Sequence, residues 1–200
     1  MSVERIREAD AARASEYISL FGSIDAAAEQ DREFVFTWAR NINGRIIDIG
    51  CGPGQWANYL HENGIDIQGV DPVPEFIDVA RQRYPDVGFR IGRADRLGVD
   101  DASLGGVLAW YSLIHTEPDQ IGALLTEFAR CIRPGGGLAI GFFQGSELAS
   151  FDHAVTTAYF WPVDLLVSHV ERAGFVIADV HTRIDPAARP HGAIIARRVP

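Results

Sequence analysis

Apolar residues recur along this chain with two periods, one typical of helices and one typical of buried strands. Apolar side chains return every three or four residues over 3–21 and 31–41, which predicts a helix in each segment. Short and nearly continuous apolar runs predict strands that are covered on both faces of a sheet. The expected strands are 45–49, 66–70, 88–91, 106–110, 137–143, 175–182 and 191–198. Further helical patterns lie between them, at 55–63, 74–83, 119–131 and 162–173.

This order of elements predicts one α/β domain. Strands that alternate with helices join into a mostly parallel sheet through right-handed crossovers, so a doubly wound, Rossmann-like arrangement is expected. The last two expected strands flank a proline-rich turn over 185–190 and predict a closing hairpin. Residues 144–160 carry no clear period, and we expect a less regular stretch there.

Composition and net charge limit the domain size, the binding partners and the cellular location that we expect for the protein. The chain has 200 residues, 47% of them hydrophobic, which suits one domain with a full-sized core. Its net charge of −9 argues against nucleic acid and against an anionic membrane as partners, because both need clustered Lys and Arg. The two cysteines, Cys51 and Cys131, have no metal-ligand spacing, and no apolar signal segment opens the chain. We therefore expect a soluble, cytoplasmic protein.

The most specific pattern is a glycine turn that follows the strand over 45–49. The segment reads Asp48-Ile-Gly-Cys-Gly-Pro-Gly54, and a helical pattern follows at once. A strand, a glycine turn and a helix start allow a ligand to approach bare backbone at the carboxyl end of a sheet. Asp71 closes the next strand, where a ribose-binding carboxylate is expected. This pattern indicates a cofactor that contains a nucleoside.

A nicotinamide or flavin dinucleotide is one candidate for that cofactor. Its fingerprint, G-x-G-x-x-G, counted from Gly50 requires a third glycine at position 55, and this chain has Gln55 there and Gly54 before it. We also expect no second domain that could hold a hydride acceptor. The spacing therefore favours another nucleoside cofactor, and an NAD-binding oxidoreductase remains an alternative.

Over 30–198 the chain resembles the class I S-adenosylmethionine-dependent methyltransferases of the small, single-domain bacterial kind. The resemblance rests on the glycine turn, on Gly69-Val-Asp-Pro72, on Gly92-Arg-Ala-Asp95 and on Arg133-Pro-Gly-Gly136, in this order. It implies a seven-stranded, mostly parallel sheet whose last strand is antiparallel, under an N-terminal helical cap. The expected parts of the single domain are N-terminal helices over 1–42, a cofactor-binding core over 45–143, and a substrate-side segment with the closing hairpin over 144–200.

The same resemblance implies where S-adenosylmethionine, and its product S-adenosylhomocysteine, would bind. Asp71 is expected to accept hydrogen bonds from both ribose hydroxyls, and Asp95 to accept one from the adenine amine. Asp48 has two open roles: it binds the aminoacyl ammonium, or it satisfies backbone donors of the glycine turn. The expected cofactor contacts are Tyr17, Asp48, Gly50, Cys51, Gly52, Gly54, Trp56, Asp71, Pro72, Ala94, Asp95, Trp110 and Tyr111.

The acceptor side is expected to begin after the strand over 106–110. Methyltransferases that act on base amines commonly carry an Asn/Asp-Pro-Pro-aromatic motif there, and its absence favours a small-molecule acceptor. His115 is the candidate general base, and the alternative is that it caps a helix or bonds a backbone carbonyl. Tyr159 and Trp161 are the candidate acceptor-pocket residues, and the alternative for such aromatics is the core.

The sequence predicts no metal site, because none of the remaining histidines has ligand spacing. The expected activity is methyl transfer to a small molecule by in-line displacement, without nucleic acid or membrane, by a monomer or homodimer. A protein of the same fold that binds the cofactor without catalysis, as a sensor, is the alternative.

Overall fold

The computed structural model of the chain describes residues 22–153, 157–186 and 188–200, so the predicted helix over 3–21 and the candidate Tyr17 lie outside it. The strands are β1 Ile46–Ile49, β2 Ile67–Asp71, β3 Gly88–Ile91, β4 Leu104–Trp110, β5 Ile132–Gln144, β6 Ala149–Asp152, β7 Thr157–Trp161, β8 Phe175–Arg183 and β9 His191–Arg198. The helices are η1 Ile24–Ala26, α2 Glu29–Ala39, α3 Gln55–Glu62, α4 Pro74–Arg83, α5 Ile121–Cys131 and α6 Val163–Arg172.

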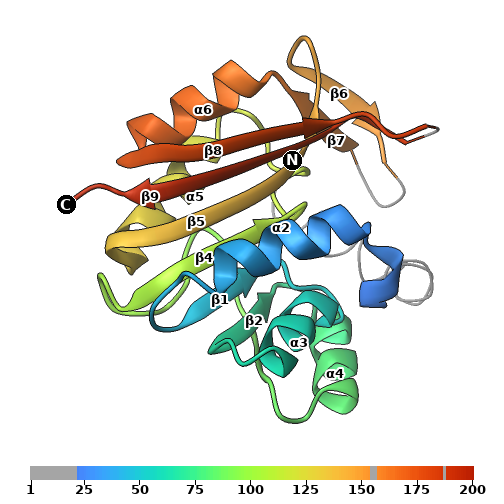
Figure 1. Cartoon of the computed structure of the whole chain (residues 1–200), viewed down its shortest axis with the longest axis vertical. Helices are drawn as coiled ribbons and strands as arrows, with labels where there is room; N and C mark the ends of the chain where they lie inside the picture. The colour runs from blue at the N-terminus through green and yellow to red at the C-terminus, as the bar shows by residue number, and fades with distance from the viewer. Residues whose placement is uncertain (1–21, 154–156, 187) are drawn as a thin grey trace.

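The central sheet confirms the predicted fold class (Figure 1). Strands β3, β2, β1, β4 and β5 lie side by side in this order, and each neighbouring pair is parallel. Strand β9 joins β5 in antiparallel register, and β8 pairs with β9. From β1 the chain continues outward through β2 and β3, and it then returns to β4 on the other side of β1. A crevice therefore forms between the carboxyl ends of β1 and β4, where sheets of this kind usually bind ligands.

The sheet is larger than predicted. Among the described residues it contains nine strands, because residues expected to be irregular form the hairpin of β6 and β7. Strand β7 extends the sheet from the end of β5, through the pairs Phe143↔Phe160 and Gln144↔Trp161. The prediction of seven strands is wrong for this reason. Strand β6 has only partly buried and exposed positions, so it lacks the apolar run that marks a buried strand.

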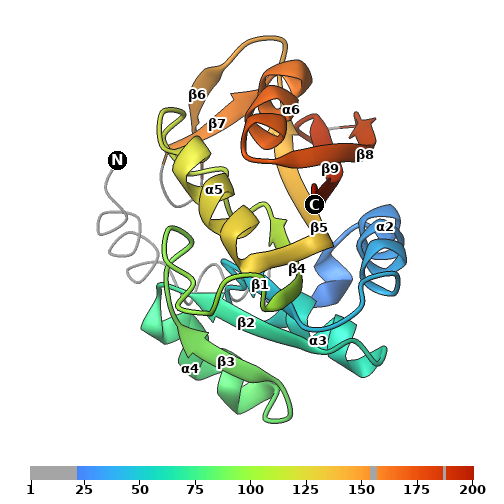
Figure 2. The ribbon, with the colours of Figure 1, turned by 90° about the vertical axis from the view of Figure 1, so that its left-hand side faces the viewer.

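Helices cover both faces of the sheet, as expected for a doubly wound fold (Figure 2). Alternate side chains of β1 point to opposite faces, which places Ile47 in one core and Ile46 in the other. The first core holds residues of α5 and α6, such as Phe128, and the second holds residues of α2, α3 and α4, such as Leu60. The carboxyl ends of the parallel strands therefore emerge between two helical layers.

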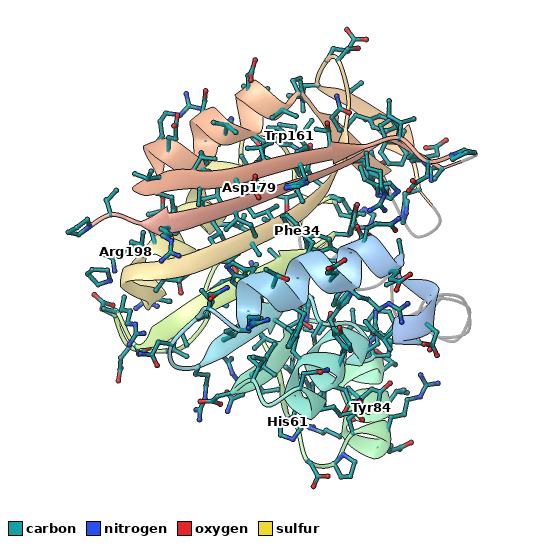
Figure 3. All side chains as sticks on the ribbon, viewed as in Figure 1. Phe34, His61, Tyr84, Trp161, Asp179 and Arg198 are labelled. Atoms are coloured by element: carbon teal, nitrogen blue, oxygen red, sulfur yellow. The ribbon has the colours of Figure 1, made fainter. Side chains whose placement is uncertain are left out.

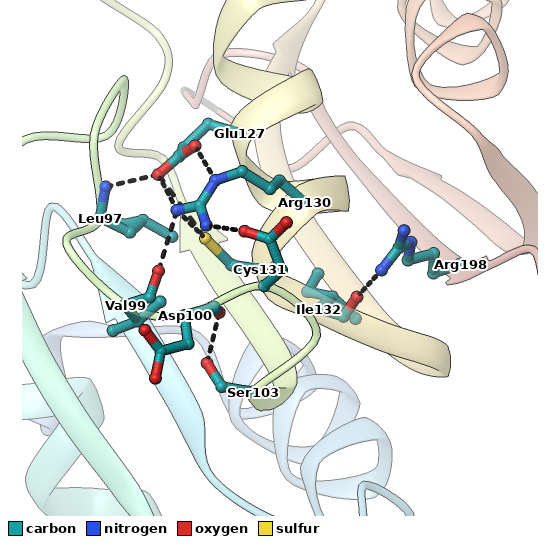
Figure 4. Close-up of polar contacts among 10 residues, drawn as sticks. Leu97, Val99, Asp100, Ser103, Glu127, Arg130, Cys131, Ile132 and Arg198 are labelled. Atoms are coloured by element: carbon teal, nitrogen blue, oxygen red, sulfur yellow. Dashed lines mark hydrogen bonds and ion pairs between the residues drawn. The ribbon is translucent and has the colours of Figure 1, made fainter.

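An ion-pair network holds α5 against the chain that leads into β4 (Figure 4). The Arg130 guanidinium donates to Glu127 at 2.8 Å, to the Val99 carbonyl at 3.0 Å, and to Asp101. Glu127 also accepts the Leu97 N–H at 2.8 Å. Because these bonds join α5 to the segment over 97–101, the network fixes the position of the helix beside β4.

Candidate active site

Two adjoining cavities lie at the carboxyl ends of β1, β2 and β4. The larger has a volume of about 410 Å³, and the smaller has a volume of about 220 Å³. Gly50, Pro72, Ser112 and His115 line both of them. The volume of the larger cavity and this place in an α/β sheet are typical of a small-molecule site.

The glycine turn between β1 and α3 forms the floor of the larger cavity. Gly50 and Gly52 have φ values of +67° and +53°, a region that favours glycine. A Cβ on Gly50 would stand 2.3 Å from the Ser112 Cβ, so a side chain has no room there. The neighbouring Cys51 is buried, and burial raises the pKa of its thiol well above the ordinary value. At Gly50 and Gly52 the turn therefore offers backbone, not side chains, to a ligand.

Gly54 has a different role from the predicted cofactor contact. Its φ of +89° starts α3, and it lines neither cavity. A Cβ at this position would lie 2.7 Å from the Phe89 ring and 3.0 Å from the Ala80 Cβ. Gly54 thus allows α3 to begin close to β3 and α4, and this packing role replaces the predicted contact.

Asp71 ties the end of β2 to the glycine turn. Its Oδ2 accepts the Gly52 N–H at 2.9 Å, and its Oδ1 accepts the Val73 N–H at 2.9 Å. Burial raises the pKa of Asp71 to about 6, while these two N–H donors oppose the rise. Each carboxylate oxygen can accept a further hydrogen bond. The side chain lines the larger cavity, where a ligand can supply that donor.

Asp48 is the second buried carboxylate of the site. Burial raises the pKa of Asp48 well above its ordinary value, the charge of Asp71 adds to the rise, and the Ala57 N–H opposes it. One oxygen thus serves the first turn of α3, while Oδ2 has no hydrogen-bond partner within the described residues. The bonded N–H belongs to α3 and not to the glycine turn, and Asp48 also lines the larger cavity, so its role toward an ammonium stays a prediction.

Four buried polar atoms that belong to residues lining the larger cavity have no partner among the described residues. They are Asp48 Oδ2, Gln55 Oε1, Ser112 Oγ and His153 Nδ1. Leaving such an atom unpaired costs about 1–3 kcal/mol, so this wall fits a ligand that carries several hydrogen-bond donors. S-adenosylmethionine, with an ammonium group and ribose hydroxyls, is a ligand of that kind for the first three atoms, which belong to β1, the start of α3 and the segment after β4.

The smaller cavity is lined by Pro72, Ala94 and Asp95, three of the predicted contacts. Arg93 donates to both oxygens of Asp95, at 2.9 and 2.6 Å. This hydrogen-bonded guanidinium lowers the pKa of Asp95, so the carboxylate is charged at neutral pH. Asp95 can still accept a further donor, since each oxygen has two lone pairs.

Aromatic residues at the end of β4 form the wall beside the glycine turn. The rings of Trp56 and Trp110 lie 5.7 Å apart, and both line the larger cavity. Tyr111 follows with a φ of +56°, a strained value for a residue with a side chain. Its hydroxyl forms a hydrogen bond with His191 Nδ1, and burial raises the pKa of Tyr111. Tyr111 lines the larger cavity, and its raised pKa keeps the phenol protonated at neutral pH.

His115 lines both cavities with a defined tautomer. Its Nδ1 lies 2.8 Å from the Thr157 carbonyl oxygen, and a carbonyl only accepts, so Nδ1 carries the hydrogen. Burial lowers the pKa of His115, and the bond to Thr157 opposes that shift. The ring is therefore neutral at pH 7, with a lone pair on Nε2. The predicted bond to a backbone carbonyl is present, and it prepares the ring to accept a proton.

A second group of residues on the wall of the larger cavity is not predicted by the sequence. It contains Phe143, His153 and His191, and an ion pair in which Arg183 donates to Asp31 and Asp185, each at 2.6 Å. These residues come from α2, the end of β5 and the two hairpins, far apart in the chain. No local pattern links them, so no signal in the sequence could have found the group.

Two residues that were predicted to line the pocket for the methyl acceptor lie outside both cavities. Trp161 is 2% exposed in the core, and its ring contacts His169 of α6, so its assignment to the pocket is wrong (Figure 3). Tyr159 lines neither cavity, and its hydroxyl donates to Glu117. Both lie on the newly found β7, whose pairing with β5 and β6 directs them away from the cavity.

Neither a metal site nor a membrane-spanning helix is found among the described residues. In the part of the chain that the structure describes, no three His, Cys, Asp or Glu residues are grouped to hold a metal ion. No helix among the described residues is long and apolar enough to cross a membrane.

A methyltransferase domain is the class of protein that this fold and this glycine turn define, and comparison with known proteins agrees. Residues 46–136 match the family described as methyltransferase domain. An uncharacterized methyltransferase of Mycobacterium tuberculosis is 35% identical over 96 residues, which cover 48% of this chain and 38% of that protein. A malonyl-[acyl-carrier protein] O-methyltransferase of Serratia marcescens is 30% identical over 145 residues, 70% of this chain and 56% of that one.

Among solved structures, a Burkholderia thailandensis 1,6-didemethyltoxoflavin-N1-methyltransferase shares the fold with a TM-score of 0.82. The two are 21% identical, and the match covers 98% of this chain and 88% of the other. That structure contains S-adenosylhomocysteine. Together, these findings confirm the resemblance: residues 46–136 match the methyltransferase domain family, and the chain has the fold of the S-adenosylmethionine-dependent methyltransferases. It spans between 38% and 56% of the length of the two curated relatives described above.

Proposed function

We propose that this protein transfers the methyl group of S-adenosylmethionine to a small-molecule acceptor, with His115 as the general base. The observation that supports this most is the tautomer of His115, which leaves Nε2 free to take a proton at the junction of the two cavities. The family match supports the cofactor, and the neutral imidazole supports catalysis over a sensor role.

In this proposal the cofactor lies across both cavities. Bound S-adenosylmethionine supplies a methyl group that is already activated on a sulfonium. The unpartnered atoms Asp48 Oδ2, Gln55 Oε1 and Ser112 Oγ would accept from its ammonium, and Asp71 would accept from the ribose hydroxyls. Pro72, Ala94 and Asp95, which line the smaller cavity, would hold the adenine. The carboxylates Asp48 and Asp71 also favour a cationic ligand.

Methyl transfer then requires only a positioned and deprotonated nucleophile. His115 Nε2 takes the proton from an acceptor O–H or N–H, while the lone pair of that atom forms the new bond to the methyl carbon. The carbon–sulfur bond breaks with its electron pair on sulfur, and His115 releases the proton to solvent. Orientation in a closed site contributes about 7–11 kcal/mol, and general base catalysis contributes about 10²–10⁴-fold.

The acidic chain supports an acceptor other than nucleic acid or an anionic membrane, since the net charge is −9. A monomer or homodimer in the cytoplasm is part of the same proposal.

Binding and transfer test the proposal separately. Titration calorimetry should give micromolar binding of S-adenosylhomocysteine and no comparable binding of NAD. S-adenosylmethionine with a labelled methyl group, incubated with a metabolite extract, should yield labelled product. Binding of NAD in place of S-adenosylhomocysteine would refute the methyltransferase assignment, and cofactor binding without any transfer would favour the sensor.

A further inference from the structure

A continuous group of aromatic rings lines the acceptor end of the larger cavity. These rings indicate which class of acceptor molecule can bind there. The Phe143 ring is at its centre, with ring centroids of Tyr111 at 5.2 Å, His153 at 5.8 Å and His191 at 6.1 Å. All four side chains line the cavity. Such walls favour a planar aromatic ligand, because stacked and edge-to-face ring pairs attract each other beyond the effect of the area they bury.

Two imidazoles stand together at this end. The ring centroids of His115 and His153 lie 5.2 Å apart, with an interplanar angle of 57°. His115 presents the acceptor atom Nε2, because its Nδ1–H is held by Thr157. His153 Nδ1 is buried and has no partner within the described part of the chain.

The charge state of His153 agrees with a role as a hydrogen-bond acceptor. Burial lowers the pKa of His153 to about 4, and the neighbouring His115 and the Arg189 guanidinium add to the shift. Arg189 itself lies over the Phe151 ring, 4.7 Å from its centroid. His153 is therefore neutral at pH 7, and a neutral imidazole has one nitrogen that accepts.

We propose that the acceptor is a planar aromatic or heteroaromatic molecule with two neighbouring O–H or N–H donors, one held by His153 and one facing His115. This inference rests on the proposed function, since His115 takes the proton of the donor that is methylated. His153 binds the second donor, which stays unmethylated, and so sets which of the two atoms faces the methyl group.

Probe molecules that differ in one feature test this inference. Protein saturated with S-adenosylhomocysteine is titrated by NMR with catechol, phenol, veratrole (the dimethyl ether of catechol) and a cyclohexane diol with adjacent hydroxyls. Catechol should bind about fivefold or more tightly than phenol, because a second buried hydrogen bond contributes about 1 kcal/mol. Veratrole and the aliphatic diol should bind more weakly than phenol.

Variants of His153 assign the effect to one side chain. His153→Phe keeps a ring and removes the acceptor, so catechol should bind only as tightly as phenol, with S-adenosylhomocysteine affinity unchanged. His153→Gln, which restores a carbonyl acceptor, should recover part of the preference. His61→Phe, at an exposed histidine of α3, is the matched control and should change nothing (Figure 3).

The outcomes separate this inference from the proposed function. Equal affinities for catechol and phenol, or a preference that survives in His153→Phe, would overturn the inference while cofactor binding stands. Failure of S-adenosylhomocysteine to bind would remove the proposed function and this inference with it. A preference that is lost in His153→Phe and partly recovered in His153→Gln supports the proposal.

Discussion

The larger cavity has two halves that are lined by different kinds of chemical group. The half around β1 and β2 consists of glycine backbone and the buried carboxylates of Asp48 and Asp71. The half beyond β5 consists of aromatic rings and histidines such as Phe143 and His153. We infer that the first half is suited to a donor with a cation and ribose hydroxyls, and the second to an aromatic acceptor. Substitutions should therefore separate cofactor affinity from acceptor chemistry.

The largest expected effect lies at the junction of the two halves. His115→Phe should lower the rate of methyl transfer about 10²–10⁴-fold, because it removes the general base. The affinity for S-adenosylhomocysteine, measured by calorimetry, should stay within about twofold of that of the unchanged protein, since removal of the base leaves cofactor contacts in place. His61→Phe is the control for loss of a histidine. A rate that is unchanged in His115→Phe would show that this histidine only holds the Thr157 carbonyl.

The next effect concerns the backbone of the cofactor half. Gly50→Ala should lower the free energy of unfolding by about 2–4 kcal/mol, because it combines a left-handed φ with a clash against Ser112. Gly64→Ala has a φ of +82° but nothing within 4 Å, so it should show only the strain, about 1–2 kcal/mol. Urea denaturation compares the two. Equal losses would mean that the turn has room for a side chain.

A smaller effect is expected at the ribose carboxylate. Asp71→Ala should weaken S-adenosylhomocysteine binding about tenfold or more, since a charge-assisted hydrogen bond contributes about 1.5–3 kcal/mol. Asp66→Ala changes a carboxylate with 58% side-chain exposure that pairs with Arg45, and it should leave the affinity unchanged. Thermal unfolding of both variants shows whether the fold is intact. Undiminished affinity in Asp71→Ala would assign Asp71 to the turn alone.

The smallest effect is a pH dependence that belongs to the cofactor half. The pKa of Asp71 is raised to about 6 by burial, so this carboxylate takes up a proton as the pH falls through that value. A protonated carboxyl accepts more weakly, so the affinity for S-adenosylhomocysteine should fall below about pH 6 and level off above it. Calorimetry between pH 5 and 8 measures this. The profile of Asp71→Asn should be flatter, and an unchanged profile would locate the titration elsewhere.

The predicted elements agree with the structure where a pattern is local. The helix over 74–83 and the strand over 88–91 match α4 and β3, because Pro74 and Gly88 mark their starts and the apolar spacing is complete within each. Strand β5 begins at Ile132, ahead of the predicted residue, because it pairs with Leu104 beyond an irregularity in register. That pairing depends on another strand and has no local signal.

The residues of the candidate site also divide into those that a local pattern predicts and those that depend on contacts between distant segments. Gly50 and Asp71 lie at the ends of strands, so alternation of strands and helices was enough to bring them to one edge of the sheet. Trp161 was misassigned because its surroundings depend on the β6–β7 hairpin, which its own segment does not reveal. His153 was missed for the same reason, since only the fold places it against His115.

The sequence by itself determined the α/β class, the position of the glycine turn and the carboxylate that follows β2, because each depends on residues close together in the chain. The tertiary structure alone decided the role of Gly54, the tautomer of His115 and the wall of rings around Phe143. The physical reason is that these depend on contacts between distant segments: a Cβ against Phe89, an N–H aimed at Thr157, and rings from separate strands.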